Sequence, residues 1–147
     1  MRKIIYLLLI VLIVVLAVFL FGGNRGNKGN RGDGGNGGNK IYETQTNSKG
    51  EVTVEVTPVS LSAKENVKFS ITLNTHSVVL DKDLKTISVL FDDEGKEYQA
   101  ISWDGGVGGH HLEGILTFPP LSSSSRSIKL RISGIANINR EFNWQLK

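Results

Sequence analysis

The chain has 147 residues with 17 basic and 14 acidic side chains, and it contains no cysteine. This composition excludes disulfides and thiolate metal sites, a blue-copper centre among them. Residues 1–40 carry six basic and one acidic side chain, a net charge of +5, whereas residues 41–147 carry eleven basic and thirteen acidic side chains, a net of −2. Because a nucleic-acid-binding domain carries its basic face on the domain itself, we expect no nucleic-acid partner.

An apolar segment of 18 residues without a single charge, residues 4–21, follows Met1, Arg2 and Lys3. About 18 such residues are enough to cross a bilayer as a helix. A cleaved signal peptide has a shorter core, of about 7–15 residues, and small residues at its cleavage site, which this chain lacks. We therefore predict an uncleaved, single-pass transmembrane anchor over residues 1–21.

The flanking charges bear on the orientation of this anchor. Arg2 and Lys3 indicate a cytoplasmic N-terminus by the positive-inside rule, although Arg25, Lys28 and Arg31 lie close to the other end. Since no globular domain precedes the anchor and the rest of the chain has a β pattern typical of surface modules, we expect the C-terminal domain to be extracytoplasmic. The predicted location is the cell membrane.

A glycine-rich linker is predicted over residues 22–40. Residues 22–39 contain nine Gly and five Asn, and Gly recurs at every third position from Gly23 to Gly38. Collagen shares this period but also needs abundant proline, which the segment lacks. A solvated coil of this composition has an average end-to-end distance of about 20–25 Å.

The remaining residues, 41–147, have the length of one ordinary domain. Apolar and polar residues alternate with period two, which is typical of half-buried strands. Between Ala100 and Ile101 the apolar phase slips, which predicts a bulge, and Arg140 interrupts an apolar face. The pattern predicts an all-β fold, an immunoglobulin-like β-sandwich of about seven strands. The strands are expected near residues 52–57, 67–73, 86–91, 97–103, 111–118, 128–132 and 138–146.

All three histidines lie in two short segments, Thr-His-Ser around His76 and Gly-Gly-His-His around His110 and His111. Neutral imidazole is a common ligand of Zn²⁺ and Cu²⁺. We predict a divalent metal site made by the three histidines, with Asp81 or Asp104 assisting and a Cu²⁺ or Zn²⁺ ion as the cofactor.

Strand geometry sets a condition on this site. Neighbouring residues on a strand point to opposite faces, so His110 and His111 reach one ion only if the chain bends at Gly109. In the competing interpretation, the histidines only hydrogen-bond nearby backbone carbonyls and lock turns. A hydrolase would need a nucleophile beside them. Ser77 and Ser102 are the nearest hydroxyls in sequence, and neither lies in a catalytic motif, so we expect no enzyme.

Several segments together resemble small prokaryotic surface domains that follow an N-terminal anchor or signal. The resemblance covers roughly residues 50–146, and the Gly-Gly-His-His segment is its most specific part. It implies an extracytoplasmic β-sandwich with its histidines drawn together, and it implies no activity. The segments are Thr-His-Ser-Val at 75–78, Leu-Asp at 80–81, Asp-Leu at 83–84, Trp-Asp-Gly at 103–105 and Gly-Gly-His-His-Leu-Glu-Gly-Ile-Leu-Thr-Phe-Pro at 108–119.

The sequence thus predicts a membrane-tethered binding module with an envelope or surface protein as partner. The alternative is a purely structural or protein–protein interaction domain of the envelope, with neither metal nor catalysis.

Overall fold

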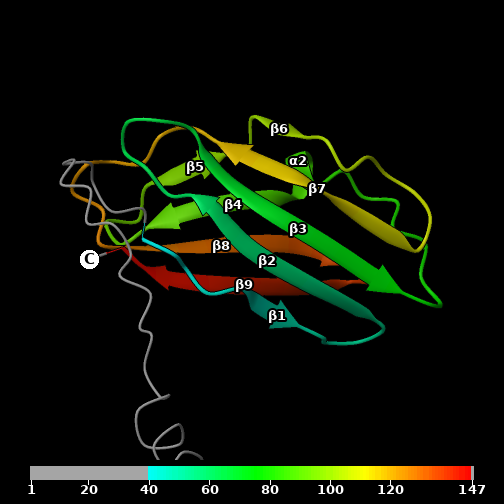
Figure 1. The fold of residues 1–147 in the computed structure, drawn as a ribbon. Coiled ribbons are helices and arrows are strands. Elements are labelled where there is room, and N and C mark those ends of the chain that lie inside the picture. Colours follow the sequence, from blue (N-terminus) through cyan, green and yellow to red (C-terminus); the bar gives the residue numbers. More distant parts are fainter. Residues whose placement is uncertain (1–39, 147) are drawn as a thin grey trace, which may run out of the picture. The chain divides into compact units, whose positions relative to one another are not determined.

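Nine strands and one short helix make up residues 40–146, the part of the chain that the computed structural model describes. Sheet A is antiparallel with strand order β1-β2-β3-β7-β6, and sheet B is antiparallel with order β5-β4-β8-β9 (Figure 1). Sheet A contains β1 (Gln45–Asn47), β2 (Val52–Ser60), β3 (Val67–Thr75), β6 (Ser102–Trp103) and β7 (His111–Phe118). Sheet B contains β4 (Ser88–Asp92), β5 (Glu97–Gln99), β8 (Ser127–Ile135) and β9 (Ile138–Gln145), and the helix α2 (Leu84–Ile87) precedes β4.

The all-β prediction is confirmed for these residues. The predicted anchor over residues 1–21 and residues 22–39 of the predicted linker lie outside the described part of the chain. Within residues 40–146, no helix has both the length and the apolar character needed to cross a bilayer.

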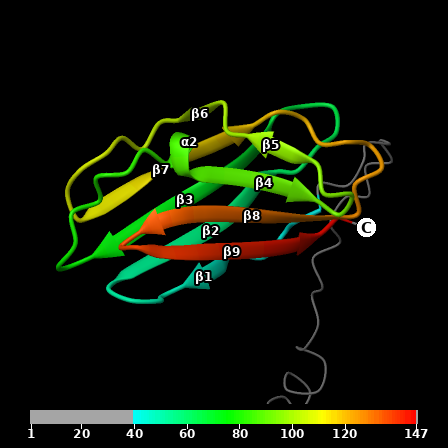
Figure 2. The ribbon, with the colours of Figure 1, turned by 180° about the vertical axis from the view of Figure 1, so that it is seen from behind.

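The core lies between the two sheets, which Figure 2 shows from behind. In β2, β3, β8 and β9, buried side chains alternate with less buried, mostly polar ones, as the alternation in the sequence predicts. In β4 the buried positions include Ser88 and Asp92, and the apolar Val89 and Phe91 are only partly buried. Phe69 of sheet A and Trp144 of sheet B meet in the middle, with ring centroids 5.3 Å apart. Val54 and Leu130, one from each sheet, are fully buried.

The predicted strand over residues 97–103 is wrong in one respect. It is not one bulged strand, because the chain leaves sheet B after β5 and joins sheet A as β6. Ala100 is buried, whereas Ile101 is 44% exposed and donates its N–H to the Thr117 carbonyl at 2.7 Å. The phase slip in the sequence therefore marks a change of sheet.

The strand predicted over residues 86–91 begins later than expected, at Ser88. Asp83 caps a turn of helix before it, because its side chain accepts a hydrogen bond from the Lys85 N–H at 2.9 Å. This cap satisfies a backbone donor that otherwise has no partner at a helix start.

Arg140 of β9 is buried with the apolar side chains on the inward face of the strand and is only 1% exposed. In the sequence it is the one charged residue that interrupts this apolar face. Its guanidinium donates to the carbonyls of Ile135 at 2.8 Å, Ile138 at 3.3 Å, Lys49 at 2.7 Å and Val52 at 3.1 Å. Burial lowers the pKa of this guanidinium. These bonds join the β1–β2 turn of sheet A to the β8–β9 hairpin of sheet B.

The outer edge of β9 is covered by the start of the domain. The side-chain amide of Gln45 makes two hydrogen bonds to the backbone of Asn143. Its oxygen accepts from the Asn143 N–H at 3.0 Å, and its NH₂ group donates to the Asn143 carbonyl. Lys40 donates to the Gln145 carbonyl at 3.2 Å. An edge covered in this way offers fewer free backbone groups to another strand. Residue 40 therefore lies where β9 ends.

A buried carboxylate holds the β4–β5 hairpin near this same end. Asp92 accepts hydrogen bonds from the Tyr98 hydroxyl at 2.8 Å, the Lys96 N–H at 2.9 Å, the Glu94 N–H at 3.1 Å and the Ser125 hydroxyl at 3.3 Å. Burial raises the pKa of this carboxyl, but the four hydrogen bonds together outweigh burial, so the pKa lies below its ordinary value.

Replacing Asp92 with asparagine tests this network. A group whose pKa is lowered by folding contributes stability above its unfolded pKa, about 3.9, and loses it as the pH falls through the folded value. We expect D92N to lower the free energy of unfolding by about 1–3 kcal/mol at pH 7. The gap between wild type and D92N should shrink below pH 4.

Urea titrations at pH 7, 5, 4 and 3 measure this gap. The matched control is D81N, because the Asp81 carboxylate accepts no hydrogen bond from the described residues and the charge change is the same. A gap for D92N that stays constant down to pH 3 would contradict the assigned network.

Candidate binding surface

Four segments meet at the end of the sheets where β3 and β8 finish, away from the C-terminus (Figure 1). We call this surface the loop end. The Arg140 side chain links the β1–β2 turn to the β8–β9 turn, and backbone hydrogen bonds link the segment after β3 to the segment before β7. The loop end consists of residues 48–51, 76–83, 106–110 and 136–137.

The second and third segments are paired almost like strands. The Thr75 N–H donates to the His110 carbonyl at 3.0 Å, the Leu80 N–H donates to the Gly109 carbonyl at 3.0 Å, and the Gly108 N–H donates to the Leu80 carbonyl at 2.7 Å. Gly108 and Gly109 have φ of 96° and 76°, values that other L-residues rarely adopt. The bend that the sequence required at Gly109 is therefore present.

His111 opens β7 and lies opposite Asn74 of β3. Its Nδ1 is 2.7 Å from the Asn74 side-chain oxygen. An amide oxygen only accepts, so this contact requires a proton on Nδ1, and in the neutral ring Nε2 then keeps its lone pair. The His110 Nδ1 lies 2.9 Å from the Val78 carbonyl, which fixes the same tautomer there.

His76 and His111 lie side by side on this surface. Their ring centroids are 6.1 Å apart and their planes make an angle of 77°. Both rings are exposed. His110 lies at the same end, since its carbonyl accepts from the N–H of Thr75, the residue before His76.

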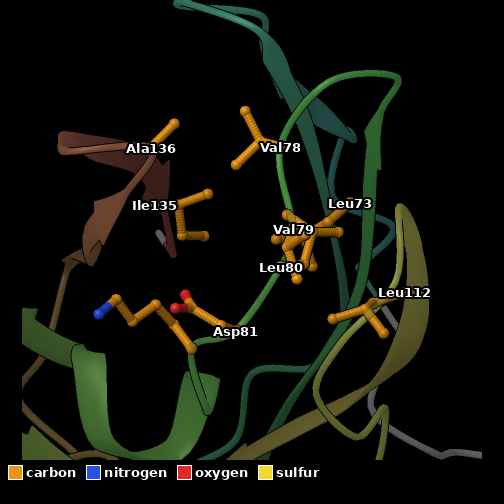
Figure 3. Close-up of a pocket in the computed structure, with 9 residues that line it drawn as sticks. Leu73, Val78, Val79, Leu80, Asp81, Leu112, Ile135 and Ala136 are labelled. Atoms are coloured by element: carbon orange, nitrogen blue, oxygen red, sulfur yellow. The ribbon is translucent and has the colours of Figure 1, made fainter.

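Of the two aspartates predicted to assist the histidines, Asp104 lies away from the loop end and Asp81 lies within it. The Asp104 carboxylate accepts the Ile115 N–H, four residues along β7 from His111, which corresponds to about 13 Å of extended strand. Asp81 lines a small pocket together with Val78 and Leu80 (Figure 3).

Among residues 40–146, no group of three or more histidine and carboxylate side chains is placed to hold a metal ion. The five-residue metal site therefore stays a prediction. What the structure brings together from it is the pair His76 and His111, with His110 beside them and turned to the Val78 carbonyl.

The pocket in Figure 3 is apolar and almost filled. Its free space, about 10 Å³, holds at most one water molecule. Small-molecule sites typically measure about 300–1,000 Å³, so the pocket takes no such ligand as it stands. Its lining is Leu73, Val78, Val79, Leu80, Asp81, Lys82, Leu112, Ile135 and Ala136.

Two apolar side chains project from the loop end. Val79 is 60% exposed and Val107 is 58% exposed, and they belong to the two segments that are hydrogen-bonded to each other. Three further exposed apolar residues, Ile41, Val59 and Ile101, lie on other parts of the domain.

Of the two hydroxyls considered for a hydrolase, Ser102 lies far from the histidines and Ser77 lies in the turn next to His76. Ser102 pairs with Thr117, six residues along β7 from His111, or about 20 Å of strand. The Ser77 N–H bonds the Thr75 hydroxyl at 3.3 Å in the turn beside His76.

Both tryptophans pack against other residues of the domain. Trp144 is buried in the core. Trp103 is partly buried, and its indole N–H donates to the Gly106 carbonyl at 2.7 Å. Its ring covers Gly105 so closely that a methyl group there would lie 2.0 Å from a ring carbon.

Sequence reasoning missed three residues of this surface: Asn74, Val79 and Val107. The partner of His111 depends on the register between β3 and β7, which the alternation does not reveal. The two valines stand in segments without regular alternation, so no period separates an exposed apolar residue from a buried one.

A comparison with protein-family models, curated proteins and solved structures finds no match to this chain. The resemblance to prokaryotic surface domains stays a prediction, and the functional argument rests on the geometry above.

Proposed function

We propose that this protein is a non-catalytic binding module, an immunoglobulin-like β-sandwich held outside the cell by a membrane anchor and a flexible linker. Its partner is a protein of the cell envelope or surface, and the loop end is the binding surface. The immunoglobulin-like assignment is supported by the strand order, since β2-β3-β7-β6 opposite β4-β8-β9 follows the order of the constant-type sandwich. β5 and β1 add one strand to each sheet.

The observation that carries this proposal is the exposure of Val79 and Val107 on segments that are rigidly paired. Loops held by a rigid scaffold are where binding residues concentrate in modules of this kind. Apolar side chains on such loops gain free energy when a partner covers them. Exposed histidines on the same segments supply the polar groups that such an interface also uses.

A protein partner suits this surface better than other classes of ligand. The pocket beneath the loop end holds at most one water molecule, so a small molecule has no cavity to enter among the described residues of this surface. The larger open hollow of the domain, about 470 Å³, lies away from it, over Ser70, Asp104 and Glu113. Residues 41–147 carry a net charge of −2, which disfavours nucleic acid. Projecting valines fit into a recess on another protein.

The point of attachment supports the same assignment. Lys40 is bonded to Gln145, at the finish of β9, whereas β9 begins at the loop end. Residue 40, where the described domain begins, therefore lies at the end opposite the loop end.

Site-specific photo-crosslinking tests the proposal. The full chain is expressed in its native membrane with a photoreactive residue at position 79 or 107, and at position 59 as a matched exposed-valine control. We expect a discrete protein adduct from position 79 that is lost when V107E is added, and one from position 107 that is lost when V79E is added. Adducts of equal yield from position 59, or none from the loop end, would overturn it.

The alternative, a purely structural domain, is favoured by one observation. The His110 bond to the Val78 carbonyl locks a turn, as that interpretation expects. In that case positions 79 and 107 give no adduct.

A further inference from the structure

We propose that His76 and His111 form an exposed two-imidazole site for a divalent transition-metal ion, with Cu²⁺ bound more tightly than Zn²⁺. The remaining coordination positions are open to water or to a donor atom from a partner. This inference deepens the proposed function, because it names a ligand class for the loop end. Only the role of a partner donor rests on the proposed function, and ion binding itself does not.

The tautomer of His111 is prepared for a metal. The Asn74 side-chain oxygen lies 2.7 Å from Nδ1 and accepts its hydrogen bond, so the neutral ring presents the Nε2 lone pair. Metal-binding histidines characteristically donate their other ring N–H to such an acceptor, which also orients the ring. Asn74 is fixed on β3 directly opposite, so the ring is held without help from the ion.

The distance between the rings fits a shared ion after a small movement. With metal–nitrogen distances of about 2.0–2.1 Å, two imidazoles on one tetrahedral ion have centroids about 5 Å apart. The observed separation is 6.1 Å. Both side chains are exposed, so a rotation of the His76 side chain can bring the two ring centroids about 1 Å closer without disturbing packed residues.

His110 carries the same imidazole group but is not part of the His76–His111 pair. Its Nδ1 bonds the Val78 carbonyl, and its own carbonyl accepts from Thr75. His110 precedes β7, and its ring is turned to the Val78 carbonyl, whereas the ring of His111 is turned to Asn74. His110 is therefore a built-in control for an exposed histidine outside the site.

The donor set selects the class of ion. Two neutral imidazoles suit Cu²⁺, Ni²⁺ and Zn²⁺, and the order of stability favours Cu²⁺. Ca²⁺ and Mg²⁺ prefer oxygen ligands and are not expected to bind.

The test is a calorimetric titration of the full-length chain in detergent with Cu²⁺ and separately with Zn²⁺. We expect one ion per chain, with Cu²⁺ tighter. H76A and H111A should each weaken Cu²⁺ binding at least tenfold, N74A should weaken it about tenfold by releasing the ring, and H110A should change it less than threefold. Electron paramagnetic resonance of the Cu²⁺ complex should show two imidazole nitrogens in wild type and one in H111A.

Two results would overturn the inference: no one-to-one binding, or a loss in H110A as large as that in H111A. All four variants alter exposed side chains, and thermal melting confirms that each is folded. Repeating the photo-crosslinking from position 79 in H111A separates the two proposals. Adducts that persist in a variant without metal binding leave the proposed function intact, whereas metal binding without adducts supports the ion site alone.

Discussion

Replacing Arg140 with alanine is expected to lower the free energy of unfolding by about 4 kcal/mol. Hydrogen bonds to a charged donor contribute about 1.5–3 kcal/mol each, not additively, and buried acceptors left without a donor add a further cost. R140A removes the donor to four carbonyls at once. The measurement is urea unfolding at pH 7 followed by tryptophan fluorescence, since Trp144 lies in the core.

Two variants make this result specific. R131A removes a half-exposed arginine whose contacts, an ion pair with Glu141 at 2.9 Å and stacking on Phe91, lie at the surface, so it should cost about 1 kcal/mol. R140M fills most of the volume without donating, so it should fall between R140A and R131A. A loss in R140A no larger than that in R131A would contradict the role assigned to Arg140.

The second large effect is expected where two glycines let the Trp103 loop lie against β7. A methyl group on Gly114 would lie 2.4 Å from the Gly105 nitrogen, and one on Gly105 would lie 2.0 Å from the Trp103 ring. Overpacking of this kind costs about 1–3 kcal/mol. We expect G105A and G114A each to lose about 2–3 kcal/mol and to shift the indole fluorescence of Trp103.

Gly108 supplies the matched control for this pair. Its φ is 96°, but a methyl group there would meet nothing within 4 Å, so G108A tests backbone strain without a clash. The left-handed conformation costs other residues about 1 kcal/mol. If G108A were as destabilising as G114A, the steric clash with Gly105 would not explain why position 114 requires glycine.

Much of the fold follows from period-two alternation. Val54, Val56 and Phe69 each fill an inward position that the pattern identifies, and all three are fully buried. The sheet change after β5 was missed because a bulge and a crossing between sheets produce the same slip in phase. Arg140 was missed because a charged side chain is buried only where carbonyls converge, and convergence depends on two distant turns.

The candidate site was predicted only in part. The sequence places the three histidines in two segments, and the structure brings those segments together through Thr75 and His110. Which histidines pair depends on the register of β3 against β7, where Asn74 stands opposite His111. Asp104 satisfies the Ile115 N–H instead, a role that only the packing of the Trp103 loop reveals.

The most direct measurement of the central claim is hydrogen–deuterium exchange of the full-length chain, compared between its native membrane and purified protein in detergent. If the loop end is the binding surface, residues 76–80 and 106–110 gain protection in the native membrane. The turns at the opposite end, residues 60–66, 93–96 and 121–126, exchange equally in both states. Protection gained at those turns instead, or no change anywhere, would contradict a binding module that acts through its loop end.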